Sequence, residues 1–275
     1  MKPLAGFRIV TLAVNLPGPA AARKLQSLGA AVTKVEPPGG DPMELYHARW
    51  YRDMAEGQTV VRLDLKAPED MARLMALLSE ADLLLSATRP AAMERLGLGW
   101  QALHQRYPRL CMVAITGFPA PRENEAGHDL TYQASLGLVN PPYMPRTLMA
   151  DMAGAEQAAS AALALLLARE RCGDAGYEEV PLSGAADAMA EPLRYGMTNT
   201  GAMLGGALAE YNIYQTSDGW VAVAALEPHF KKRLEDSLKV ASLEEYRTAF
   251  ALQSSEYWQE WGVKMDLPIE AVRSM

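Results

Sequence analysis

Short apolar runs alternate with helical patterns along the first 115 residues. Five runs are apolar and rich in strand formers: 7–13, 30–36, 60–65, 82–86 and 110–115. The spacing of apolar residues and of good helix formers predicts helices over 20–28, 68–80 and 100–107. Pro19 suits the first turn of the first helix and Gly29 its end. This alternation predicts a Rossmann-like, doubly wound α/β domain with a parallel sheet.

A long helix follows the α/β alternation. Residues 117–150 contain five prolines and are expected to form loops. Residues 151–171 are rich in Ala and Leu, with no proline and a single glycine, which predicts a long and mostly buried helix. Asp151 stands at its start, where a carboxylate suits the N-cap and the positive end of the helix dipole.

The last part of the chain has a different pattern. Residues 196–209 are rich in Gly and Ala, and we interpret them as a connector between a large domain, 1–195, and a smaller domain, 210–275. In the smaller domain, the runs 211–215 and 220–224 flank a Ser-Asp-Gly turn, which predicts a β-hairpin. Helical segments follow it, so the second domain is expected to be α+β.

Composition narrows the function classes. The 275 residues carry a net charge of −7, which disfavours a general binder of nucleic acid or of anionic membranes. The longest apolar stretch, 158–168, has eleven residues, whereas about 20 are needed to span a bilayer. Two cysteines, Cys111 and Cys172, exclude a disulfide framework, and Cys111 is expected in the core. We expect a cytoplasmic protein without a metal site, because metal-ligand spacing is absent.

Three side chains are candidates for proton chemistry. His128 follows a glycine in a polar loop, and an imidazole with a pKa of about 6.5 suits proton transfer near neutrality; a structural role is the alternative. Asp151 either only caps its helix or provides a carboxylate for catalysis. Glu227 follows an apolar strand and precedes a proline, so it either caps the next helix or belongs to a site. In the turn over 16–20, Gly18 stands alone and does not make a dinucleotide fingerprint.

Thirteen segments, taken together, resemble the class III CoA-transferase family, which includes formyl-CoA transferase, carnitine CoA-transferase and α-methylacyl-CoA racemase. They occur in family order: 3–10, 17–20, 28–36, 63–66, 89–90, 93–98, 115–118, 127–129, 149–151, 214–219, 225–230, 257–258 and 267–272. The resemblance implies an acyl-CoA thioester as substrate, no permanently bound cofactor, and a homodimer of interlocked chains. Since the sequence ends at Met275, we expect that interlock to be incomplete.

The racemase branch is the more similar one. Its members resemble this chain in having Gly-His-Asp, here 127–129, and Glu-Pro-x-Phe, here 227–230. The resemblance then implies that His128 and Asp151 form the acid/base pair at the α-carbon of the thioester and that Glu227 supports His128. Backbone N–H groups at the start of the Asp151 helix would stabilise the enolate oxygen. In the transferases, Asp151 would instead be the nucleophile that forms an acyl anhydride.

The resemblance also assigns contacts to coenzyme A. They fall on Leu63, Asp64, Leu65, Lys66, Ala87, Thr88, Arg89, Arg95, Gly127, Asp129, Leu130, Thr131 and Tyr132. The chain departs from the family at Pro37, where a basic residue is expected, and at 55–58, which carries no positive charge. Residues 152–156 replace the usual run of glycines. These departures motivate a third hypothesis, a CoA-binding homologue without turnover.

Overall fold

The computed structural model describes residues 1–273 and divides into two compact units, Met1–Ala190 and Glu191–Met275. The division falls a few residues before the expected end of the large domain at 195. Residues 196–209, expected as a connector, therefore belong to the second unit. The chain end at Met275, on which the expectation of an incomplete interlock rests, lies outside the described residues.

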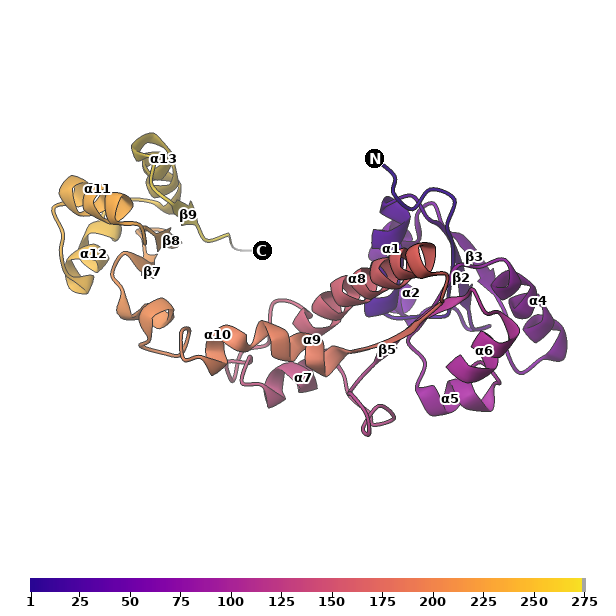
Figure 1. Ribbon diagram of the computed structural model, residues 1–275. Helices are drawn as coiled ribbons and strands as arrows, with labels where there is room; N and C mark the ends of the chain where they lie inside the picture. Colours follow the sequence, from indigo (N-terminus) through magenta and orange to yellow (C-terminus); the bar gives the residue numbers. More distant parts are fainter. Residues whose placement is uncertain (274–275) are drawn as a thin grey trace. The chain divides into compact units, whose positions relative to one another are not determined.

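The first unit contains a six-stranded parallel sheet (Figure 1). Its strands are β1 (Arg8–Thr11), β2 (Ala31–Glu36), β3 (Thr59–Arg62), β4 (Leu83–Ser86), β5 (Cys111–Thr116) and β6 (Tyr177–Pro181). Every neighbouring pair is parallel, in the order β3-β2-β1-β4-β5-β6. This order is that of the doubly wound Rossmann-type sheet, so the predicted fold class is confirmed. The strand β6 was not expected from the sequence.

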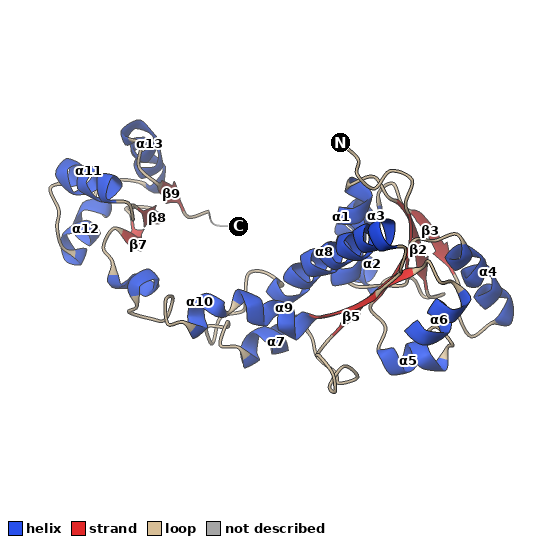
Figure 2. Cartoon of the chain, in the orientation of Figure 1, coloured by secondary structure: helices blue, strands red, loops and turns tan. Residues whose placement is uncertain are grey.

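Helices cover both faces of this sheet (Figure 2). The helices of this unit are α1 (Pro17–Ser27), α2 (Pro42–Tyr46), α3 (Ala48–Ala55), α4 (Pro68–Ser79), α5 (Pro90–Arg95), α6 (Trp100–Arg106), α7 (Asp129–Ser135), α8 (Met149–Cys172) and α9 (Leu182–Met189). Successive strand side chains point to opposite faces. Leu83 and Leu85 join a core with α1 and α8, whereas Leu84 packs with α4, α5 and α6. Burial on both faces explains the nearly continuous apolar runs, and Cys111 lies in this core as predicted.

The helix expected over 151–171 begins earlier than predicted. In the structure α8 starts at Met149, and Leu148 occupies the N-cap position without a side-chain cap. Asp151 therefore lies within the first turn and does not cap the helix. At the other end, Gly173 adopts a left-handed conformation that ends α8.

The second unit contains the predicted hairpin, β7 (Tyr211–Gln215) paired antiparallel with β8 (Trp220–Ala224). A third strand, β9 (Ile269–Ala271), pairs with β8 and was not predicted. The remaining elements are α10 (Glu191–Arg194), an irregular helical turn (Met203–Ala207), α11 (Pro228–Leu238), α12 (Leu243–Phe250) and α13 (Ser255–Met265). Stacked aromatic rings, including Tyr214 and Phe250 at 4.9 Å between centroids, fill the core of this α+β unit.

Candidate active site

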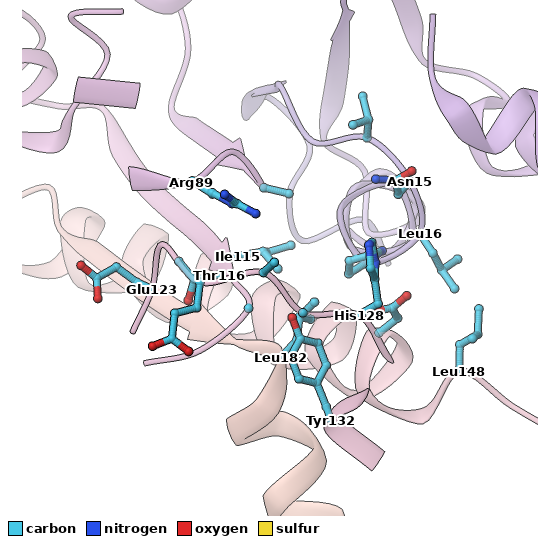
Figure 3. Close-up of a pocket in the computed structure, with 18 of the residues that line it drawn as sticks. Asn15, Leu16, Arg89, Ile115, Thr116, Glu123, His128, Tyr132, Leu148 and Leu182 are labelled. Atoms are coloured by element: carbon cyan, nitrogen blue, oxygen red, sulfur yellow. The ribbon is translucent and has the colours of Figure 1, made fainter. Parts of the chain in front are cut away.

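Two adjoining pockets lie at the carboxyl end of the parallel sheet. The larger has a volume of about 400 Å³ and is lined by the segments after β1, β4 and β5, together with residues of α2, α7, α8 and α9 (Figure 3). The smaller has a volume of about 270 Å³, and residues 63–66, directly after β3, line it with Thr88. Val14 lines both. Open α/β sheets bind ligands at this edge, where the strand order reverses between β1 and β4.

The turn after β1 forms one wall of the larger pocket. A Cβ atom on Gly18 would lie 2.0 Å from the Cβ of Ala13, so only glycine lets α1 begin this close to the end of β1. Asn15 adopts a left-handed conformation with φ of 67°. Asn15, Leu16 and Pro17 thereby line the pocket. The isolated glycine of this turn thus serves close packing.

Tyr132, on α7, forms part of the floor of the pocket. Its ring packs edge-on against Phe118, with 5.2 Å between the centroids. A Cβ on Gly127 would lie 2.5 Å from Cε1 of the ring, and a Cβ on Gly117 would lie 2.6 Å from its hydroxyl oxygen. These two glycines therefore leave the space that the phenol occupies. Figure 3 shows the hydroxyl directed into the pocket.

His128 immediately precedes α7 and lines the larger pocket. Its backbone is fixed by Thr131, because the Thr131 hydroxyl oxygen accepts a hydrogen bond from the His128 N–H at 3.1 Å and the hydroxyl donates to the His128 carbonyl at 2.7 Å. His128 as a whole is exposed. The backbone anchor and the exposure suit a residue that exchanges protons with a bound ligand.

Asp151 reaches the same pocket from the first turn of α8. Its backbone N–H donates to Oδ1 of Asp129 at 3.1 Å. The other oxygen of Asp129 accepts from Gln133 at 2.6 Å, and Gln133 also donates to the carbonyl of Thr147. Asp129 and Gln133 are buried. The carboxylate of Asp129 thus takes the place of the missing N-cap on α8 and joins α7 to the start of that helix.

Burial, and to a smaller extent the nearby charge of Asp129, together raise the pKa of Asp151 from 3.8 to about 6. Desolvation and a like charge both disfavour the ionised carboxylate. Asp151 therefore gains and loses its proton close to neutrality. Among the described residues, none donates a hydrogen bond to its carboxylate.

The expected oxyanion site at the start of α8 stays a prediction, although two of the backbone N–H groups there already have partners. The N–H of Asp151 is bound to Asp129, and the N–H of Met152 donates to the carbonyl of Leu148. Neither group is available to an enolate oxygen. In the 152–156 segment, Gly154 is buried against α9, where a Cβ would lie 2.3 Å from Leu182.

Comparison with known proteins identifies the family. The sequence model of CoA-transferase family III matches residues 4–271. This chain belongs to CoA-transferase family III. It is 32% identical over 249 residues to a succinyl-CoA–D-citramalate CoA-transferase of Chloroflexus aurantiacus, which covers 82% of this chain and 62% of that protein. It is equally 32% identical over 260 residues to human α-methylacyl-CoA racemase, covering 87% of this chain and 65% of the racemase.

A solved family III structure shares the fold. The crystal structure of Rv3272 from Mycobacterium tuberculosis matches with a TM-score of 0.88 and 26% identity, over 100% of this chain and 85% of that chain. Rv3272 is described as a probable fatty acyl-CoA transferase, and its sequence is 30% identical to this chain over 267 residues. The aligned part covers 84% of this chain and 68% of Rv3272. This chain therefore spans between 62% and 68% of the length of these relatives. Racemases and CoA-transferases both occur among the family III relatives, so the family leaves the specific reaction open.

Most of the residues assigned from the family resemblance lie around the two pockets. The larger is lined by Ala87, Arg89, Gly127, His128, Tyr132 and Asp151. The smaller is lined by Leu63, Asp64, Leu65, Lys66 and Thr88. Four others line neither pocket: Arg95, Asp129, Leu130 and Thr131. Of these four, Asp129 and Thr131 hold the backbones of the two candidate catalytic residues, whereas Arg95 and Leu130 are exposed.

Glu227 belongs to the second unit. It precedes α11, is exposed, and makes no side-chain cap on that helix. The support of His128 by Glu227 stays a prediction.

The sequence did not indicate several other residues of the pocket wall. Met43 and Tyr46 come from α2. Leu148 directly precedes α8, and Leu182 directly follows β6. Only α2 had a usable signal, because Asp41 followed by a proline is the pattern of an N-cap with proline at the first helical position. The two leucines reach the pocket through tertiary packing alone.

Within residues 1–273, no three His, Cys, Asp or Glu side chains are grouped closely enough to hold a metal ion. Over the same residues, no helix combines the length and the apolar character that crossing a bilayer requires.

Proposed function

We propose that this chain binds an acyl-CoA thioester and moves a proton at its α-carbon, as a racemase does. The observation that carries the proposal is the convergence of His128 and Asp151 on one pocket. They come from the starts of two different helices, α7 and α8.

The chemistry needs two groups that exchange protons near neutrality. A thioester acidifies its α-C–H bond, and one group removes that proton while the conjugate acid of the other returns a proton to the opposite face. A histidine side chain is the commonest general acid or base in enzymes, and Asp151 acquires this capacity through a pKa of about 6. Either residue can then act as the base, which is what interconversion of two stereoisomers requires.

The two pockets suit the two ends of such a substrate. The smaller pocket, with residues 63–66, takes the nucleotide end of coenzyme A, and the thioester reaches the larger pocket past Val14. Lys66 and Arg89 supply positive charge for the phosphates. In Figure 3, Leu16 and Leu148 lie on the side of the pocket away from Arg89 and Glu123, which favours an apolar acyl group at that end.

Proton exchange tests the proposal directly. The wild-type protein is incubated with a 2-methylacyl-CoA in D₂O, and deuterium at the α-carbon is followed by mass spectrometry. We expect incorporation, with a loss of at least about a hundredfold in rate when His128→Ala or Asp151→Asn removes one proton carrier. His104 on α6, which lines neither pocket, provides the control, because His104→Gln should leave the rate unchanged. Absence of exchange with a panel of apolar thioesters would overturn the proposal.

A CoA-transferase reaction is the second candidate. It is favoured by the Asp151 carboxylate, which no described residue binds, and by relatives that are themselves CoA-transferases. The carboxylate oxygen would attack the thioester carbonyl, forming a mixed anhydride and releasing the CoA thiolate. The thiolate would then attack the aspartyl carbonyl of the anhydride, which releases the first acid and leaves an aspartyl-CoA thioester. The carboxylate of the second acid would attack this thioester, and the thiolate released would attack the acyl carbonyl of the new anhydride, giving the second acyl-CoA and free Asp151. Hydroxylamine converts such an anhydride to an aspartyl hydroxamate, and its appearance on Asp151 would favour this reaction over proton transfer.

Binding without turnover would point to the third hypothesis. Calorimetry with CoA measures affinity independently of reaction. Micromolar binding, together with neither α-exchange nor hydroxamate, would identify a CoA-binding homologue that has lost catalysis.

A further inference from the structure

A buried cluster of charged side chains lies behind one wall of the larger pocket. Lys34 of β2 places its Nζ 2.8 Å from Oε1 of Glu36 and 2.5 Å from Oδ2 of Asp41. All three residues are at most 2% exposed. The Tyr51 hydroxyl donates to Glu36 at 2.8 Å, and its ring centroid lies 4.7 Å from the lysine nitrogen. The cluster connects β2, α3 and Asp41, the N-cap residue of α2.

Asp41 connects this cluster to the backbone of the pocket wall. Its Oδ1 accepts hydrogen bonds from the N–H groups of Asn15 and Met43, both at 2.9 Å. Asn15 belongs to the turn after β1 and holds a left-handed conformation, which non-glycine residues adopt at a cost. Asn15 and Met43 both line the larger pocket. One carboxylate therefore fixes two wall segments that are 28 residues apart in the sequence (43 − 15).

Stability alone does not account for burying these charges. A buried ion pair contributes little net stability compared with apolar residues of similar size, because both charges lose their hydration. A buried carboxylate does provide an acceptor in a fixed place for several donors at once. Lys34 holds one oxygen of Asp41, which leaves the other directed at the two backbone N–H groups.

We infer that Asp41 is a positioning residue that sets the wall of the acyl-CoA pocket through the backbones of Asn15 and Met43. The consequence for catalysis rests on the proposed function, whereas the positioning itself does not. Asp41 lines neither of the two pockets. Asp41 instead fixes the positions from which Leu16, Met43 and their neighbours contact the substrate.

Asp41→Asn is the informative change. The amide has one oxygen and one NH₂ group, so an NH₂ must face either Lys34 or the two backbone N–H groups. We expect amide hydrogen exchange to accelerate about tenfold in peptides covering 14–18 and 42–46. In the α-proton exchange assay, we expect KM to rise about tenfold and kcat to change less than threefold, because binding contacts are lost while His128 and Asp151 stay in place.

A matched control lies at the opposite end of the same sheet. Asp82, just before β4, accepts from Arg169 at 2.8 Å and from the backbone N–H of Arg8 at 2.7 Å. Asp82→Asn therefore disturbs a comparable carboxylate that holds a backbone N–H. It should leave both KM and the exchange of residues 14–18 unchanged. Tyr51→Phe is a milder second variant, which should accelerate exchange in the same two segments by a smaller factor.

The outcomes separate the inference from the proposed function. Unchanged exchange at 14–18 and 42–46 in both Asp41→Asn and Tyr51→Phe would overturn the positioning role. A fall in kcat at constant KM would also overturn it, since that result indicates a smaller folded fraction. If the wild type fails with every thioester while exchange accelerates as expected in the two segments, the positioning stands and the proposed reaction falls.

Discussion

The carboxylate of Asp151 should lower the stability of the folded protein. Its pKa rises from 3.8 to about 6 on folding, first through burial and then through the charge of Asp129. The folded chain therefore binds this proton more tightly than the unfolded chain, and stability falls as the pH rises from about 4 to about 6. At 1.36 kcal/mol for each pKa unit, the full difference is about 3 kcal/mol above pH 6.

Asp151→Asn tests this magnitude. The amide cannot ionise, so the variant should be more stable than the wild type by about 1–3 kcal/mol at pH 8, the lower values applying if pocket water screens the charge. Below pH 4 the two proteins should be nearly equal, because Asp151 is then protonated in the folded wild type. Urea unfolding followed by circular dichroism at several pH values gives both quantities.

The control is an exposed carboxylate on α3. Asp53→Asn alters the same functional group without burial, and it should change stability by less than about 0.5 kcal/mol at every pH. The reasoning would be refuted if Asp151→Asn were less stable than the wild type at pH 8. A stability difference that did not vary between pH 4 and pH 8 would refute it equally.

Three further predictions concern the site and the assembly. Asp129→Asn removes the like charge beside Asp151, so the acid limb of the kcat/KM profile, expected near pH 6, should move to lower pH; an unchanged limb contradicts this. Gly127→Ala would place a Cβ 2.5 Å from the ring of Tyr132 and should weaken acyl-CoA binding at least tenfold by calorimetry, whereas Gly39→Ala, with open space around it, should not. We also propose a homodimer, which light scattering at micromolar concentration should detect and a monomer mass would exclude.

Local pattern predicted the sheet better than it predicted the site. Strands buried on both faces must be apolar throughout, so five of the six parallel strands were visible as apolar runs. The hairpin of the second unit was equally visible, because two alternating runs flanked a Ser-Asp-Gly turn. The strand β6, in contrast, carries Glu178 and Glu179 on the edge of the sheet and has no apolar run. Its pairing with β5 depends on tertiary contacts.

The candidate functional residues were predicted for a different reason. His128 and Asp151 came from the family resemblance, since their local surroundings also suited a structural role. No local pattern contains the link between them. The carboxylate of Asp129, a residue predicted to contact coenzyme A, accepts a hydrogen bond from the backbone N–H of Asp151. The same holds for Asp41, whose neighbours Asn15 and Met43 are brought together only by the folded chain.

The perturbed carboxylate alone does not distinguish a racemase from a transferase. A group with a pKa of about 6 is mostly ionised at pH 7, so Asp151 can attack a carbonyl as a nucleophile or accept a proton as a base. The difference lies in the second group that shares the pocket. A transferase needs only the carboxylate and a departing thiolate, whereas a racemase needs a second proton carrier facing the same carbon. The presence of His128 in that pocket, on a backbone anchored by Thr131, is therefore the feature that favours proton transfer.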